Sequence, residues 1–183
     1  MRRRNNNYSR TFVLINFTEY DLNNSTFVGV IFKQCDFTRV YLSGSFFGGS
    51  IFEKCILEEN ILRKAHWDNC RFEQCNIRKI DAFRTTFLEA EFVDVNIIGG
   101  KLIKCEIMAA ELNNVKFINC DLSDTSFSEA KMENVIFENC IFNNNTDFSE
   151  VSLDKNVTFN NTTVIKDDDK KFYTGNDVIQ VII

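Results

Sequence analysis

The sequence contains no proline and only one histidine in 183 residues. Proline lacks a backbone N–H group, so its absence leaves every residue able to donate a hydrogen bond between neighbouring strands. No stretch reaches the 18 or so apolar residues that a membrane-spanning helix needs. The basic start Met1–Arg4 is not followed by the apolar run of a secretory signal. We therefore expect one cytoplasmic domain behind a flexible basic tail, residues 1–9.

The motifs of common catalytic and cofactor sites are also missing. His66 stands beside Trp67 and has no partner pattern for a catalytic triad or a zinc site. A phosphate-binding loop, a dinucleotide fingerprint and a Glu-x-x-His motif are all absent. The sequence therefore predicts no catalytic residue, no cofactor and no metal, and a protein that is not an enzyme.

A five-residue period runs through most of the chain. From Phe12 to Phe142, 26 of 27 positions spaced five apart carry a large apolar residue, and Ala82 is the exception. A helix repeats every 3.6 residues and a strand every two. A period of five requires a backbone that turns a corner every five residues and directs the same position toward one interior.

The position two residues before each large residue is selective for small side chains. It holds Ala, Cys, Ser, Thr, Val or Gly in 22 of 27 repeats, and all seven cysteines fall there. Side chains that stack in parallel suit neither disulfide geometry nor tetrahedral zinc. We expect the cysteines to be free, buried filler in a reducing compartment. They are Cys35, Cys55, Cys70, Cys75, Cys105, Cys120 and Cys140.

A longer period of 20 residues is nested in the first. Leu22, Leu42 and Leu62 recur at this spacing, as do Phe52 and Phe72. The simplest geometry has four sides of five residues in each coil, with coils stacked about 4.8 Å apart. Residues 10–145 then form almost seven coils and a rod of roughly 30–35 Å with one continuous core.

These repeats resemble the pentapeptide-repeat family, whose pattern is a small residue, Asp or Asn, Leu or Phe, and two variable residues. Matching segments are Cys35-Asp36-Phe37, Cys75-Asn76-Ile77, Val95-Asn96-Ile97 and Cys120-Asp121-Leu122. The resemblance covers about residues 10–165 and implies an all-β, right-handed quadrilateral β-helix of about seven to eight coils. The chain lacks the long loops of the plasmid quinolone-resistance members and is more similar to loop-free members.

Two places break the repeat. At Ala82 the core position is small, and the sequence leaves open whether Phe83 turns inward or a small void remains. Near Asn143–Phe148 one residue is inserted, after which the core positions continue at Phe148 and Leu153. A further insertion moves them to Phe159 and Val164, so the repeats extend to about residue 165.

The segment 166–183 departs from the repeat and ends in an apolar run. A solenoid exposes an unpaired edge at each end, which natural proteins cover. The segment is therefore either a cap on the last coil or a contact in a homodimer. Members of the family related to quinolone resistance often dimerise through their C-termini. The candidate contact residues are Val178, Ile179, Val181 and Ile182.

A second candidate interface occupies the position after each core residue. This position is mostly polar elsewhere but apolar in six successive repeats, and exposed apolar bands often mark interfaces. Local packing under longer neighbours is the alternative. The residues are Phe83, Leu88, Val93, Ile98, Ile103 and Met108.

Charge is distributed unevenly along the chain, whose net charge is −5. Residues 1–90 carry 13 Lys and Arg against 10 Asp and Glu, whereas residues 91–183 carry 8 against 16. An acidic rod of DNA-like width can mimic the phosphate backbone, and the resemblance implies such a role in gyrase-binding members. A basic zone argues against a uniform mimic. It comprises Arg63, Lys64, Arg71, Arg78, Lys79 and Arg84.

The sequence predicts a non-catalytic, bacterial protein that acts through protein–protein interaction with an unidentified partner. The alternative is a DNA-mimicking binder of DNA gyrase or topoisomerase IV that protects the enzyme from quinolones. Neither direct nucleic-acid binding nor membrane binding is expected.

Overall fold

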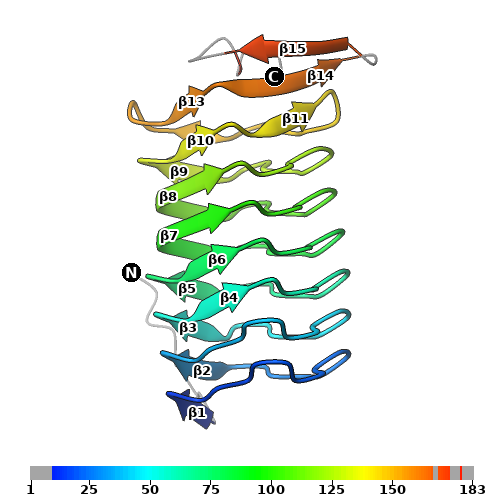
Figure 1. The fold of residues 1–183 in the computed structure, drawn as a ribbon. Helices are drawn as coiled ribbons and strands as arrows, with labels where there is room; N and C mark the ends of the chain where they lie inside the picture. Colours follow the sequence, from blue (N-terminus) through cyan, green and yellow to red (C-terminus); the bar gives the residue numbers. More distant parts are fainter. Residues whose placement is uncertain (1–9, 167–168, 174–177, 179–183) are drawn as a thin grey trace.

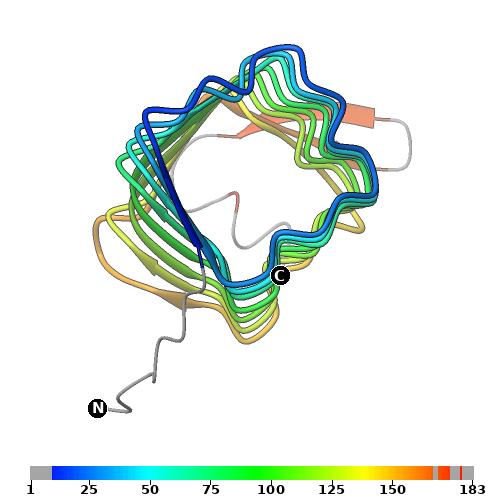
Figure 2. The same ribbon diagram turned by 90° about the horizontal axis from the view of Figure 1, so that it is seen from below.

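The chain winds into a four-sided β-solenoid of about eight turns, as the repeat predicted. The computed structural model describes residues 10–166, 169–173 and 178. Figure 1 shows the coils stacked along the rod, and Figure 2 shows their outlines superimposed along its axis. The described strands are β1 (Arg10–Val13), β2 (Val30–Lys33), β3 (Ile51–Glu53), β4 (Ile56–Glu58), β5 (Arg71–Glu73), β6 (Asn76–Arg78), β7 (Glu91–Ile98), β8 (Glu111–Ile118), β9 (Lys131–Glu133), β10 (Ile136–Glu138), β11 (Ile141–Asn143), β12 (Ser152–Leu153), β13 (Thr158–Asn160), β14 (Thr162–Lys166) and β15 (Asp169–Tyr173).

Neighbouring coils pair in parallel at an offset of 20 residues. Phe12 lies opposite Phe32, which lies opposite Phe52, and the register continues in the same way to β7. After the predicted insertions the offset grows, because Ser126 lies opposite Asp147 and Phe137 opposite Phe159. The predicted period of 20 and the positions of both insertions are therefore confirmed.

Each coil has four sides, which we number by their core residues. The first side contains Phe12, Phe32 and Phe52, the second Phe17, Phe37 and Leu57, the third Leu22, Leu42 and Leu62, and the fourth Phe27, Phe47 and Trp67.

The backbone turns each corner with a residue in the left-handed region. The residue two positions after the core residue has positive φ in every repeat from Leu14 to Asn139, and in most of them it is not glycine. This conformation costs about 1–2 kcal/mol for an ordinary L-residue. Its N–H group donates to the next coil, as Arg39 does to the carbonyl of Glu58 at 2.8 Å and Lys64 to that of Phe83 at 3.0 Å. Hydrogen bonds between coils thus offset the free-energy cost of the left-handed conformation at each corner.

The interior is a stack of like side chains. The rings of Phe52 and Phe72 lie 5.1 Å apart with 9° between their planes, and Phe92 continues the stack at 4.8 Å. All seven cysteines are free and buried, as predicted. The Cys105 thiol donates to the carbonyl of Ala82 at 2.9 Å, and burial raises its pKa to about 12. Cys105 is therefore a protonated core residue.

The structure resolves the break at Ala82. Ala82 is buried, whereas Phe83 is half-buried and lies outside the core, with the Arg84 guanidinium 5.2 Å from its ring centroid. Within this repeat the sizes are exchanged, because Ile80 occupies the small position and is buried. Gly100 in the next coil leaves space mainly for Leu102, since a Cβ there would lie 2.7 Å from Cδ1 of Leu102 and 3.4 Å from Cγ1 of Ile80.

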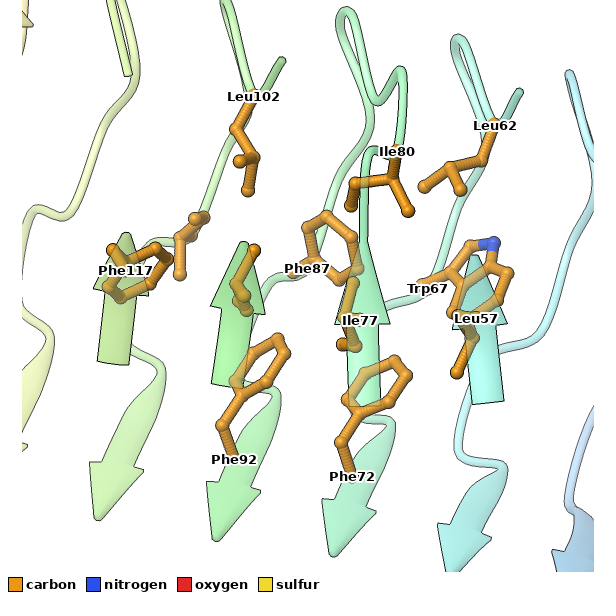
Figure 3. A pocket seen from close by; sticks show the side chains of 12 residues that line it. Leu57, Leu62, Trp67, Phe72, Ile77, Ile80, Phe87, Phe92, Leu102 and Phe117 are labelled. Atoms are coloured by element: carbon orange, nitrogen blue, oxygen red, sulfur yellow. The ribbon is translucent and has the colours of Figure 1, made fainter. Parts of the chain in front are cut away.

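An enclosed cavity of about 20 Å³ remains beside this exchange (Figure 3). Leu62, Ile80 and Leu102 border it together with aromatic residues, and its lining is entirely apolar. A cavity of this size admits about one water molecule, but an apolar cavity without polar partners stays dry. It is a packing defect too small for a cofactor.

The described part of the C-terminal segment includes β15 and Val178. β15 turns back and pairs antiparallel with β14, and Val178 is fully buried. The predicted contact residues Ile179, Val181 and Ile182 lie outside the described residues. No helix in the described part of the chain is long and apolar enough to cross a membrane.

Candidate protein-interaction surface

The six apolar residues predicted as an interface do not form one patch. Phe83 and Ile103 lie on the third side, and Leu88 and Met108 on the fourth. The remaining two, Val93 and Ile98, lie on the first and second sides in β7, where Ile98 is opposite Ile118. All six are half-buried. A flat partner therefore contacts the residues of only one or two sides at a time, and stacking between coils accounts for part of their burial.

The fourth side carries carboxylates and no basic residue. Its outward positions from Thr26 to Glu150 contain no Lys or Arg, and its only other ionisable side chain is His66. The sheet bridges from Phe46 through His66 to Thr86 and onward keep these positions in register. We call this surface the acidic face. Its carboxylates are Asp68, Glu89, Glu106, Glu129, Asp147 and Glu150.

The carboxylates of the acidic face are not neutralised by described neighbours. None of the ion pairs found within residues 10–166 includes one of them. Two accept hydrogen bonds instead, Asp68 from the N–H of Leu88 at 3.0 Å and Asp147 from the N–H of Ser149 at 2.8 Å. The bond from Ser149 lowers the pKa of Asp147. The face is therefore negatively charged at neutral pH.

The first and second sides differ because their charges are paired along columns. Lys33 binds Glu53 at 2.9 Å, Arg39 binds Glu19 at 2.8 Å and Lys79 binds Glu59 at 2.9 Å, each pair spanning adjacent coils. Such exposed pairs add little stability, at most about 1 kcal/mol. Their effect here is to cancel charge, so these sides present mixed surfaces without a dominant sign.

A basic column borders the acidic face. Lys64, Arg84 and Lys104 occupy successive corners between the third and fourth sides. Lys104 lies 3.9 Å from Asp124 at the end of this column. An open groove of about 480 Å³ runs between the column and the acidic face. It is lined by Arg84, Lys104, Cys105, Glu106, Met108, Asp124 and Ser126.

His66 lies between the side chains of its neighbours on the fourth side, Phe46 and Thr86. Its Nδ1 atom lies 3.3 Å from Thr86 Oγ1, and its ring centroid lies 5.6 Å from that of Phe46. Within the described residues, no group of three or more His, Cys, Asp or Glu side chains is placed to hold a metal ion.

Two family models match the chain at the repeats that build this surface. One, described as pentapeptide repeats in nine copies, matches residues 12–56, and the other, a pentapeptide repeat region, matches residues 90–166. Both matches fall on the coils seen in the structure. The chain belongs to the pentapeptide-repeat family.

Solved pentapeptide-repeat structures are similar to this chain at low identity. A trypsin-treated form of QnrB1, a plasmid-mediated fluoroquinolone resistance protein, is 20% identical over 85% of this chain and 87% of its own, with a TM-score of 0.36. HetL, involved in heterocyst differentiation regulation in the cyanobacterium Nostoc, is 16% identical over 90% and 93%, with a TM-score of 0.20. No curated protein matches the chain. Similarities at this level carry no information about a partner.

The acidic face of this pentapeptide-repeat protein was not predicted from its sequence. Comparing the two halves of the chain found the acidic C-terminal half but averaged over all four sides. The signal was present in the 20-residue period, because every outward position of one side in five coils lacks a basic residue. Reading charges by side rather than by half would have found it.

Proposed function

We propose that this chain is a non-catalytic rod that acts by binding another protein through its outer surface. The observation that supports this proposal is the acidic face, on which one sign of charge persists through successive coils while the first and second sides pair theirs. A rigid scaffold with a uniform charged strip suits recognition of a partner, whereas the described residues offer no constellation for catalysis. Seven free thiols fit a reducing compartment, which favours the cytoplasm as the location of this protein.

The chemistry of the acidic face defines the partner that it fits. Carboxylates recur at about the coil spacing of 4.8 Å, from Asp68 in the third coil to Glu150 in the seventh. A partner with Lys or Arg side chains along a groove or helix matches this strip. Complementary charge of this kind accelerates association and selects the orientation of docking.

DNA mimicry of a type II topoisomerase is the second candidate, and the acidic face is the observation that favours it. B-DNA carries one negative charge per about 1.7 Å of its axis. The acidic face carries roughly one carboxylate per coil, or one per about 4.8 Å, which is about a third of that density. The neighbouring column of Lys64, Arg84 and Lys104 reduces the field further. These magnitudes favour the general binding rod over a close electrostatic copy of DNA.

A capture experiment with matched variants tests the binding rod. The double variant Glu106→Gln, Glu129→Gln removes two charges from the acidic face, and Glu111→Gln, Glu133→Gln removes two from the first side at similar height. We expect the wild type and the control to retain the same partner from extracts of the native host and the acidic-face variant to lose it. Equal capture by both variants would contradict the proposal.

A supercoiling assay separates the second candidate from the first. Purified DNA gyrase and topoisomerase IV would be titrated with the protein, with and without a quinolone. Inhibition or protection that disappears in Glu106→Gln, Glu129→Gln but persists in the control supports DNA mimicry. An unchanged assay together with a captured partner supports the general binding rod alone.

A further inference from the structure

Within residues 10–166, the N-terminal end of the rod is a layer of the core that no further coil covers. Phe12, Phe17, Leu22 and Phe27 are half-buried, whereas the equivalent residues from Phe32 to Phe148 are all buried. All of the large apolar residues that are exposed within the described part of the chain lie in the first three coils. Those of the first coil are Val13 (48% exposed), Leu14 (71%), Ile15 (40%), Tyr20 (59%) and Val28 (54%).

The side chains at this end show that no further coil of the same repeat fits beneath it. The small position of each coil points toward the preceding coil, as Cys55 Sγ reaches the carbonyl of Phe32 at 3.4 Å. In the first coil these positions include Arg10 and Tyr20, which are larger than any side chain at this position in the later coils. The ring of Tyr20 lies edge-on to Phe17 with centroids 6.3 Å apart. Tyr20 spreads over the end layer and remains about half exposed.

The backbone of the first coil is also open on this side. In the second coil, Asp36 donates to the carbonyl of Ile15 at 3.0 Å and accepts from the N–H of Phe17 at 2.7 Å. The equivalent groups of Asn16 and Asp21 in the first coil face the end, and no described residue pairs with them. An open strand edge beside apolar side chains recruits another chain.

The opposite end restricts what this edge can meet. β15 runs antiparallel over β14, so the C-terminal end does not offer a parallel coil on which an N-terminal end of another copy could stack. The nine residues before β1 are mostly polar, with three Arg, three Asn and only Met1 and Tyr8 as large apolar residues, and their composition does not suit an apolar cover. Glu19 near this end is paired with Arg39, so its charge is balanced within the chain.

We propose that two copies of this chain associate through their N-terminal ends to form an end-to-end dimer. A twofold axis perpendicular to the rod brings the same surface of both copies together and closes the assembly at two chains. It also reverses the strand direction, so the two β1 edges meet antiparallel. Tyr20, Ile15 and Leu14 of each copy lie in this contact.

Light scattering and small-angle X-ray scattering on the full chain test the dimer. We expect twice the monomer mass and a longest dimension of roughly 75 Å instead of about 38 Å, because eight coils rise by about 4.8 Å each. Tyr20→Glu places a charge in the contact and yields folded monomers whose melting temperature no longer depends on protein concentration. Ile61→Glu is the control, because Ile61 is also partly exposed (37%) but lies on the third side away from the end.

Leu14→Glu provides a second test, because this side chain is the most exposed of the set and its replacement does not disturb the core. Monomers in both Tyr20→Glu and Leu14→Glu, with dimers in Ile61→Glu, support the proposal. A wild type that is monomeric over a hundredfold range of concentration overturns it and assigns the end to another cover. A dimer that persists in both end variants also overturns it and places the contact elsewhere.

Discussion

At the C-terminal end of the rod, β15 folds back on β14 and Val178 is fully buried, whereas the N-terminal end finishes with Tyr20 and Ile15 about half exposed. Every interior coil pairs with a neighbour on both sides, so the repeat alone satisfies its backbone and its core. The last coil gains a cover by leaving the repeat and reversing direction. The first coil keeps the repeat and changes only side-chain size. A solenoid therefore needs non-repetitive sequence only where its stack stops.

The largest expected effect contrasts a core ring in mid-stack with its equivalent at the open end. Phe72 lies between Phe52 and Phe92 and is fully buried, so Phe72→Ala should cost about 3–5 kcal/mol. In a chain kept monomeric by Tyr20→Glu, Phe12→Ala should cost clearly less, because Phe12 is half-buried in the monomer. Denaturant midpoints measure both, with Glu73→Gln as an outward control expected within about 0.5 kcal/mol of wild type. Equal losses at Phe12 and Phe72 would mean that the N-terminal end is covered.

Truncation of the cap should have the next largest effect. Deleting residues 177–183 removes Val178, whose full burial contributes about 1.5–3 kcal/mol. The last coil loses part of its cover, so the protein should melt at a lower temperature and aggregate. Deleting residues 2–9 is the matched change at the other end and should leave the melting temperature nearly unchanged. If the C-terminal deletion instead halves the mass and leaves melting intact, the segment is a dimer contact.

The corners offer a smaller effect that tests the backbone. Lys54 is exposed and has a φ of 54°. Lys54→Val should destabilise by about 1–2 kcal/mol, because a β-branched residue tolerates this region poorly. Lys54→Gly removes the steric cost at the price of chain entropy and should be neutral or slightly stabilising. Thermal unfolding of the two variants compares them directly, and equal melting temperatures would reject the left-handed corner.

The rate of thiol labelling should distinguish a cysteine next to the first coil from a cysteine in the middle of the rod. Burial raises the pKa of Cys70 well above its ordinary value, so its thiol stays protonated and unreactive in the native state. Cys35 faces the first coil and should be the first of the seven to react with Ellman's reagent as that coil opens. Peptide mapping after brief labelling identifies the site. Rapid labelling of most of the seven would contradict the burial that the structure shows.

The raised pKa of Cys70 also makes the stability of the fold depend on pH. The pKa of Cys70 is raised in the fold above the value of about 9 expected without burial. The fold is therefore stabilised in full below that pH and loses this contribution as pH rises beyond it. Replacing Cys70 by Ala, a residue common at this position, should flatten the loss of stability at alkaline pH.

The sequence by itself determined the architecture, because a period of five with a nested period of 20 is compatible with one kind of backbone. It located the core positions from Phe12 to Phe142, the buried cysteines and the insertions after Phe142, since each follows from which side chains recur. The corner residues could also have been found, because no β-branched side chain occupies that position from Leu14 to Asn139.

Tertiary structure alone decided the features that depend on competition between neighbours. Phe83 lies outside the core, while Ile80 of the same repeat is buried at the small position. The acidic face is a different case, because the 20-residue period of the sequence already places its carboxylates on one side. The cover of the last coil required the antiparallel return of β15, which no repeat predicts. Periodicity specifies a coil, but only packing between coils determines what its surface and its ends present.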